Sequence, residues 1–178
     1  IKQSGVKPSM LYFKGKARVF HSMEDASNAV INDEINEGDV LVIRYEGPKG
    51  GPGMREMHMT TSLIVGRGMD EKCALITDGR FSGSTRGPCV GHISPEAAAR
   101  GPIAAVEEGD EIVIDIPNRK IELLVPQNVI EERLKNIKLF VKERSGVLAK
   151  YSDLVTSADK GAVLLPKSQH VKTANIKY

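Results

Sequence analysis

Short apolar runs alternate with polar, glycine-rich connections along the chain, and these runs predict a set of strands. They lie at residues 17–20, 40–43, 73–76, 111–116 and 120–125. Runs of this kind, bounded by turn residues, are too short for buried helices and favour strands. The last two flank Pro117-Asn118-Arg119, which is turn chemistry typical of a hairpin, so we expect them to pair antiparallel.

Apolar residues at helical spacing occupy the segments between several of these runs. They predict helices over residues 22–35, 54–65, 94–101 and 128–144. Ser22 stands three residues before Asp25, a capping-box-like start for the first helix. Gly38 is expected to close that helix.

Two similar turns indicate how the strands are layered. Glu37-Gly38-Asp39 leads into the run at 40–43, and Glu108-Gly109-Asp110 leads into the run at 111–116. A single echo is too little for a solenoid, which needs at least three units, but it suits two related β-layers. We therefore predict an α/β fold in which a mixed, partly closed sheet is flanked by helices.

The composition is that of a globular protein. Of 178 residues, 40% are hydrophobic and 27% are charged, which disfavours disorder and coiled coils. The formal charge of +2 favours neither nucleic acid nor an anionic membrane as a partner. No apolar run exceeds four residues, which excludes a transmembrane helix or a signal-peptide core. We expect a soluble, intracellular chain, and its first residue, Ile1, suggests a piece of something longer.

A first glycine-rich stretch, residues 47–56, connects a strand to a helix. Its prolines stiffen a loop whose amides can converge at the helix start, where an anion or a metal-bound anion is favoured. A dinucleotide-binding fingerprint fails here, because Glu56 stands at its third glycine position and Pro52 lacks an amide donor. Glu56, expected on the first helical turn, suggests a ligand for a hard cation such as Mg²⁺. The alternative for Glu56 is a solvated acid that complements the helix dipole.

A second glycine-rich stretch, residues 78–92, contains three hydroxyl side chains and two arginines. These residue types favour a backbone cradle over a floppy lid. No hydrolase triad surrounds Ser82. Cys89-x-x-His92 lacks a second ligand pair, so a buried small side chain and a structural imidazole are favoured over a metal site. With Cys73 as the one other cysteine, the chain by itself is too poor in thiols to hold an iron–sulfur cluster.

Three motifs in order resemble the carboxy-terminal part of the dihydroxy-acid and phosphogluconate dehydratase family. They are GPKGGPGMREM at 47–57, ITDGRFSGSTRG at 76–87 and HISPEAAARGPIAAVEEGD at 92–110. The resemblance runs from about residue 4 to residue 163. The full first motif is more similar to the branch that serves isoleucine and valine biosynthesis than to the sugar-acid branch.

The resemblance implies a two-domain enzyme. Residues 1–163 would form its swivelling β/β/α domain and residues 164–178 a tail extension. An amino-terminal domain, the expected partner, would carry the cysteine ligands of a [2Fe–2S] or [4Fe–4S] cluster and further Mg²⁺ ligands. The resemblance also implies that the enzyme forms a homodimer or higher homo-oligomer and that it is located in the cytoplasm or in an organelle stroma or matrix. The isolated chain is expected to be inactive.

The implied reaction removes water from a 2,3-dihydroxy carboxylic acid to give a 2-keto acid. In that scheme Ser82 is the base that takes the C2 proton and Glu56 binds Mg²⁺. Arg80, Ser84 and Thr85 are further candidates for substrate or cradle contacts, with a loop-stabilising ion pair as the alternative for Arg80. Other functions left open are a sugar-acid or phosphogluconate dehydratase, a detached regulatory or assembly domain, and a non-catalytic module that binds a nucleotide or phosphate.

Overall fold

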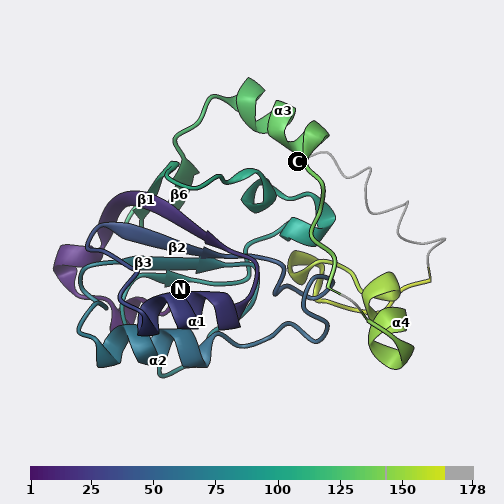
Figure 1. Cartoon of the computed structure of the whole chain (residues 1–178), viewed down its shortest axis with the longest axis horizontal. Coiled ribbons are helices and arrows are strands. Elements are labelled where there is room, and N and C mark those ends of the chain that lie inside the picture. Colours follow the sequence, from purple (N-terminus) through teal and green to yellow (C-terminus); the bar gives the residue numbers. More distant parts are fainter. Residues whose placement is uncertain (143, 167–178) are drawn as a thin grey trace.

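A six-stranded mixed sheet forms the centre of the computed structural model, which describes residues 1–142 and 144–166. The strands are β1 (Tyr12–Phe20), β2 (Asp39–Ile43), β3 (Ala74–Thr77), β4 (Cys89–Val90), β5 (Glu111–Asp115) and β6 (Lys120–Leu123). Their spatial order is β4-β3-β2-β1-β5-β6. The first four in this order are linked by parallel pairs, whereas β5 is antiparallel to both β1 and β6. The sheet curls into a half-barrel (Figure 1), as the predicted partly closed α/β fold requires.

Helices cover both faces of the sheet. They are α1 (Met23–Ile31), α2 (His58–Gly66), α3 (Gln127–Asn136) and α4 (Gly146–Leu154), with short 3₁₀ turns that include Ala97–Ala99 and Pro102–Ala105. Figure 1 shows α1 and α2 together on one face, α3 on the other side, and α4 beside the loops at the carboxyl ends of the parallel strands.

Strand β2 divides the hydrophobic core into two layers. All of its residues are buried. Val40 and Val42 pack into the layer beneath the 3₁₀ turns, whereas Leu41 and Ile43 pack into the layer beneath α1 and α2. Because successive side chains of a strand point to opposite faces, this continuous apolar run is what a central strand covered on both sides requires.

The predicted strands are all present, but the four predicted helices are shorter than expected. The helix predicted over 54–65 begins only at His58. Helix α1 ends at Ile31 instead of residue 35. The helix predicted over 128–144 ends at Asn136, since Ile137 turns to extended backbone and packs against the core. The segment predicted as a helix over 94–101 contains only a 3₁₀ turn.

Two matching turns flank the central strand β1, in agreement with the echo in the sequence. In each turn an aspartate Oδ2, of Asp39 or Asp110, accepts the N–H of the residue three positions earlier at 2.8 Å. Gly38 and Gly109, which precede them, adopt positive φ angles of 89° and 83°, a conformation that glycine adopts without strain. Gly38 therefore belongs to the turn before β2 and does not cap α1.

The predicted tail, residues 164–178, is described only at its start. Leu164 forms an isolated antiparallel bridge with Val155, at the end of α4. Residues 167–178 lie outside the described part of the chain.

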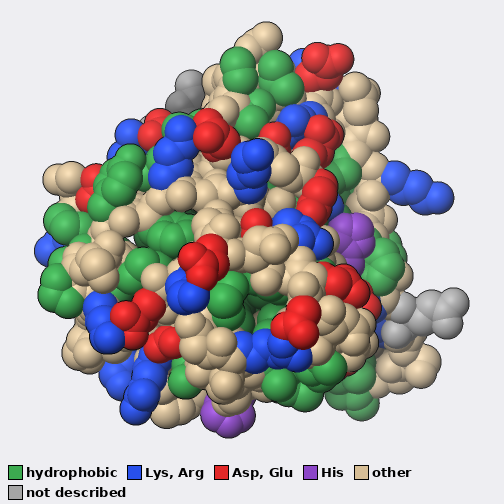
Figure 2. Space-filling view, turned by 60° about the vertical axis from the view of Figure 1, so that its left-hand side comes forward, with side chains coloured by type: hydrophobic (Ala, Val, Ile, Leu, Met, Phe, Trp, Pro, Cys, Tyr) green, Lys and Arg blue, Asp and Glu red, His purple; other side chains and the backbone are tan. Residues whose placement is uncertain are grey.

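The surface mixes charges of both signs. On the face in Figure 2, basic and acidic side chains lie interspersed. Ion pairs on the surface of the protein include that of Arg18 with Glu108 at 2.6 Å. Within residues 1–142 and 144–166, none of the helices combines the length and the apolar character needed to span a bilayer.

We predict that replacing the cap of α1 destabilises the protein. The Ser22 Oγ accepts the Asp25 N–H at 3.0 Å, which confirms the predicted cap. Ser22→Ala should lower the free energy of unfolding by about 1 kcal/mol, measured by urea denaturation. Ser22→Asp, which keeps an acceptor at this position, should lie close to the wild type. Equal losses in both variants would show that the cap contributes little.

Candidate functional site

The two glycine-rich loops meet at one edge of the sheet. The first glycine loop, residues 47–56, follows β2, and the second glycine loop, residues 78–92, follows β3 and includes β4. Because β2 and β3 are parallel neighbours, both loops start from the same edge of the sheet, at the carboxyl ends of the strands. That edge is where open α/β sheets usually bind their ligands.

The backbones of the two loops pair with each other. The Met57 N–H donates to the Arg80 carbonyl at 2.8 Å, and the Arg80 N–H donates to the Arg55 carbonyl at 3.1 Å. This places Glu56 beside Arg80 in a parallel bridge. The expectation that Glu56 lies on the first turn of a helix is wrong, because α2 begins only at His58 and the bridge holds the preceding backbone extended.

A buried carboxylate, Asp78, ties these loops to a third segment. Its Oδ1 accepts the Glu46 N–H at 2.9 Å, and its Oδ2 accepts the N–H groups of Tyr45 at 3.1 Å and Ala97 at 2.9 Å. Burial raises the pKa of Asp78, and the three backbone N–H groups oppose that rise because they favour the carboxylate. Asp78 therefore fixes the starts of both loops and the 3₁₀ turn after them.

Glu96, also buried, fills the first glycine loop from inside. Its two carboxylate oxygens accept the N–H groups of Lys49 at 2.8 Å and Gly50 at 2.7 Å. A Cβ at Gly47 would lie 2.8 Å from Glu96 Oε2, so only glycine fits there. Burial raises the pKa of Glu96, and the same two bonds oppose it.

This arrangement corrects the expectation that the amides of the first glycine loop are free to bind an anion. The N–H groups of Lys49 and Gly50 are already bound to a carboxylate of the chain itself. A phosphate in the same place would meet the negative charge of Glu96. The non-catalytic phosphate-binding alternative thus loses the feature that suggested it.

A third buried carboxylate, Glu46, lies at the base of the loop. Its Oε1 accepts the Met23 N–H at 2.9 Å and forms ion pairs with Lys142 at 2.9 Å and Arg55 at 3.4 Å. Its Oε2 is buried and lacks a hydrogen-bond partner within the described residues. Two cations on one carboxylate offset the cost of burying its charge and link the loop to α1 and to the segment after α3.

The segment that leads into α4 holds the first glycine loop from outside. Arg144 donates to the Gly50 carbonyl and to the Ser152 Oγ, both at 2.7 Å. The Ser152 hydroxyl donates in turn to the Lys49 carbonyl at 3.1 Å. The loop is therefore bonded on its N–H side and on its carbonyl side, which supports the predicted stiffness.

Ser82 lies in a tight turn of the second glycine loop. The Thr85 N–H donates to the Ser82 carbonyl at 3.2 Å and closes the turn. The Ser82 Oγ accepts the Ser84 N–H at 3.3 Å and lies 3.0 Å from the Ser84 Oγ. The Ser82 side chain is half-buried, so its hydroxyl has local donors and remains accessible.

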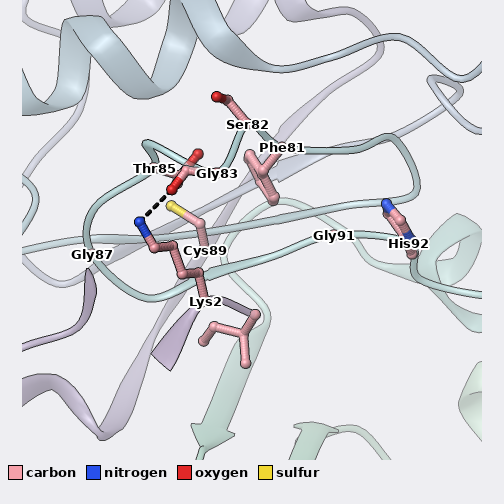
Figure 3. Close-up of a pocket in the computed structure, with 10 residues that line it drawn as sticks. Lys2, Phe81, Ser82, Gly83, Thr85, Gly87, Cys89, Gly91 and His92 are labelled. Carbon is pink, nitrogen blue, oxygen red and sulfur yellow. Dashed lines mark hydrogen bonds between the residues drawn. The ribbon is translucent and has the colours of Figure 1, made fainter. Parts of the chain in front are cut away.

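A pocket of about 430 Å³ lies beside this turn (Figure 3). Its lining residues are Ile1, Lys2, Phe81, Ser82, Gly83, Thr85, Gly87, Cys89, Gly91 and His92. Glu56 is not among them. The structure therefore brings the backbones of the two loops together, while Glu56 and Ser82 do not share this pocket.

The further candidates in the second glycine loop differ in their surroundings. The exposed Arg80 donates from Nε to the Met54 carbonyl at 2.7 Å and so ties the two loops together through a hydrogen bond to a carbonyl. Ser84 contacts Ser82 directly. Thr85 is buried, and its hydroxyl lacks a hydrogen-bond partner within the described residues.

Neither cysteine has the chemistry of a cluster ligand. Burial raises the pKa of both thiols, Cys73 and Cys89, to about 12, whereas iron–sulfur clusters are bound by thiolates. Both pack in the layer beneath α1 and α2, as expected for Cys89. The expectation of a structural imidazole is wrong, since His92 is exposed. These side chains do not fit an iron–sulfur cluster.

The residues present fit one ligand of a magnesium site. The Glu56 carboxylate is half-buried and has no hydrogen bond or ion pair within the described residues, so its oxygens are free. The same part of the chain contains no group of three or more His, Cys, Asp or Glu side chains that could hold a metal. Mg²⁺ commonly takes one or two carboxylates and keeps other positions for water or substrate, so further ligands would have to come from another part of a larger protein.

The sequence analysis missed the three carboxylates that organise the loops. Asp78 follows directly on the buried strand β3, Glu46 lies three residues after the end of the buried strand β2, and Glu96 follows Pro95. An acidic residue within a few positions of the end of a buried strand is the one signal that could have identified the first two. Their role as acceptors depends on loops distant in the sequence, which no local pattern specifies.

Comparison with known proteins assigns the fold and loops to a family. The sequence profile described as dihydroxy-acid/6-phosphogluconate dehydratase, C-terminal, matches residues 1–162. The dihydroxy-acid dehydratase of Aquifex aeolicus is 61% identical over 165 residues, and that of Thermodesulfovibrio yellowstonii is 58% identical over the same length. The enzyme of that name from Geobacter metallireducens is 57% identical over 164 residues. Each alignment covers 92% of this chain and 30% of the relative.

We predict that Asp78→Ala severely destabilises the protein. The substitution leaves the N–H groups of Tyr45, Glu46 and Ala97 buried without an acceptor, so the free energy of unfolding should fall by about 3 kcal/mol or more, measured by urea denaturation. Glu132→Ala, which removes an exposed carboxylate from α3, is the control and should change it by less than about 0.5 kcal/mol. A mild effect of Asp78→Ala would mean that water replaces the lost acceptor.

Proposed function

The chain belongs to the dihydroxy-acid/6-phosphogluconate dehydratase family and corresponds to the C-terminal domain of its members. We therefore propose that it supplies one side of the active site of a dehydratase. The chain spans about 30% of the length of the relatives it matches. The remaining part of such an enzyme would contribute the other side of the site. The substrate would be a 2,3-dihydroxy carboxylic acid of branched-chain amino-acid biosynthesis, and the product a 2-keto acid.

In this proposal Ser82 is the base. The C2 proton of the substrate passes to Ser82 Oγ and the C3–O bond breaks. The departing hydroxide takes that proton from Ser82 and leaves as water, which restores the base, and the resulting enol tautomerises to the 2-keto acid. When bound, an iron–sulfur cluster would act as a Lewis acid on the departing hydroxyl, and Mg²⁺ would bind the substrate carboxylate and C2 hydroxyl. The cluster ligands would come from the partner domain.

One observation carries the assignment of Ser82. Its oxygen accepts the Ser84 N–H and lies within hydrogen-bond distance of the Ser84 hydroxyl. A serine hydroxyl is a weak base unless its alkoxide is stabilised, and donors aimed at the oxygen favour the ionised form. The hydroxyl is also accessible, as a group that takes a proton from substrate must be.

The geometry of Glu56 supports its proposed role as a Mg²⁺ ligand. The backbone bridge to Arg80 fixes its position relative to the second glycine loop. Its carboxylate has no hydrogen bond or ion pair within the described residues, in contrast to Asp78 and Glu96, each of which accepts backbone N–H groups with both oxygens. Mg²⁺ prefers a carboxylate of this kind.

Ser82→Ala in the full-length enzyme should lower kcat by about 10²–10⁴-fold, the usual contribution of a general base. The measurement is steady-state formation of the 2-keto acid. The absorption spectrum of the cluster should stay unchanged, because Ser82 would not be one of its ligands. Ser9→Ala, at an exposed serine far along the chain from the loops, is the matched control. Near-normal turnover by Ser82→Ala would reject the base assignment.

Glu56→Gln should raise the Mg²⁺ concentration for half-maximal activity at least about tenfold, since an amide is a weaker ligand for a hard cation. Activity of the full-length enzyme is titrated with Mg²⁺, and thermal stabilisation by Mg²⁺ is measured in parallel. Glu132→Gln on α3 serves as the control. An unchanged Mg²⁺ dependence would return Glu56 to the role of a solvated acid.

A further inference from the structure

The amino-terminal segment, residues 2–5, lies along the turn that carries Ser82. The Lys2 ammonium donates to the Gly83 carbonyl, directly after Ser82. At the other end of the segment, the Gly5 carbonyl accepts the Gly87 N–H at 3.0 Å. A segment more than eighty residues away in sequence thus bonds the second glycine loop within the serine turn and again two residues after it.

The contact between the segment and the loop is close. A Cβ at Gly5 would lie 2.7 Å from the Thr85 carbonyl oxygen, so the two backbones approach more closely than a side chain allows. Thr85 is buried there. The position of the segment is therefore set by packing as well as by its two hydrogen bonds.

Lys2 holds the turn from the side opposite to the Ser82 hydroxyl. Figure 3 shows the Lys2 side chain reaching the Gly83 carbonyl while the Ser82 hydroxyl points away from Lys2. Lys2 is the one lysine or arginine among the residues that line this pocket, and none of them is an aspartate or glutamate. No carboxylate of the pocket therefore competes with the Gly83 carbonyl for the ammonium.

We propose that Lys2 is a positioning residue for Ser82, which holds the Gly83 carbonyl so that the serine oxygen keeps one direction. The inference rests on the proposed function of Ser82 and adds a residue to it. Gly83 itself is exposed and has no side chain, so without Lys2 the peptide between Gly83 and Ser84, whose N–H donates to the Ser82 Oγ, can rotate. A base that is displaced by a fraction of an ångström still allows substrate to bind but slows proton transfer.

The test compares Lys2→Met and Lys2→Arg in the full-length enzyme. Lys2→Met keeps the aliphatic length but loses the donor, and should lower kcat by about 100-fold with KM changed by less than about threefold. Lys2→Arg can still donate to the carbonyl and should recover most of kcat. Hydrogen exchange of the amides at 84–87 should accelerate in Lys2→Met and remain slow in Lys2→Arg.

Lys7→Met is the matched control, because Lys7 lies on the same stretch of chain and its side chain forms an ion pair with the exposed Glu71, away from the second glycine loop. It should leave kcat and the exchange rates unchanged. The urea midpoint of Lys2→Met should also match the wild type, since an exposed bond of this kind adds little stability. Loss of the fold would therefore contradict a positioning role.

Measuring Ser82→Ala alongside separates the two proposals. Wild-type kcat in Lys2→Met, or Lys2→Arg no better than Lys2→Met, together with an inactive Ser82→Ala enzyme, overturns the role of Lys2 alone. An active Ser82→Ala enzyme overturns the function of the site, and the role of Lys2 with it.

Discussion

The acceptance of three backbone N–H groups by the buried Asp78 carboxylate is the constraint on which this edge of the molecule depends. It joins the end of β2, the start of the second glycine loop and the turn that begins at Ala97. A neutral side chain could not satisfy all three donors, and each unsatisfied buried donor costs free energy. Burial raises the pKa of Asp78 because it disfavours the charged carboxylate. The three hydrogen bonds offset this cost of burying the charge, and they exist only while the three segments stay together.

The same principle shapes the first glycine loop. Loops rich in glycine normally gain order at an entropic cost, but here carboxylates of the chain take the place that a bound anion takes in phosphate-binding loops. Glu96 accepts two backbone N–H groups of the loop on its inner side. Arg144 and Ser152 donate to two of its backbone carbonyls on the outer side. The glycines serve close packing against these side chains, and the loop is rigid without any ligand.

Against this filled framework, the two groups assigned to chemistry stand out because they are unsatisfied or accessible. Glu56 has a carboxylate without a hydrogen bond or ion pair within the described residues, and Ser82 has an accessible hydroxyl whose oxygen accepts the Ser84 N–H. The thiols of Cys73 and Cys89 are the reverse, being buried with strongly raised pKa values. With the roles proposed for Ser82 and Glu56, the domain would offer one base and one metal ligand, which fits a site completed by another part of a larger protein.

The sequence by itself determined the local features: the buried strands, the Ser22 cap, the matching turns at Gly38 and Gly109, and the two loops with Glu56 and Ser82. These depend on residues close together in the chain, and so they leave a readable pattern. Only the tertiary structure decided where α3 ends and which carboxylates organise the site. Those outcomes depend on contacts between segments that are distant in the sequence. The local sequence around a helix end or around a single acidic residue does not change with such a contact, so it cannot predict one.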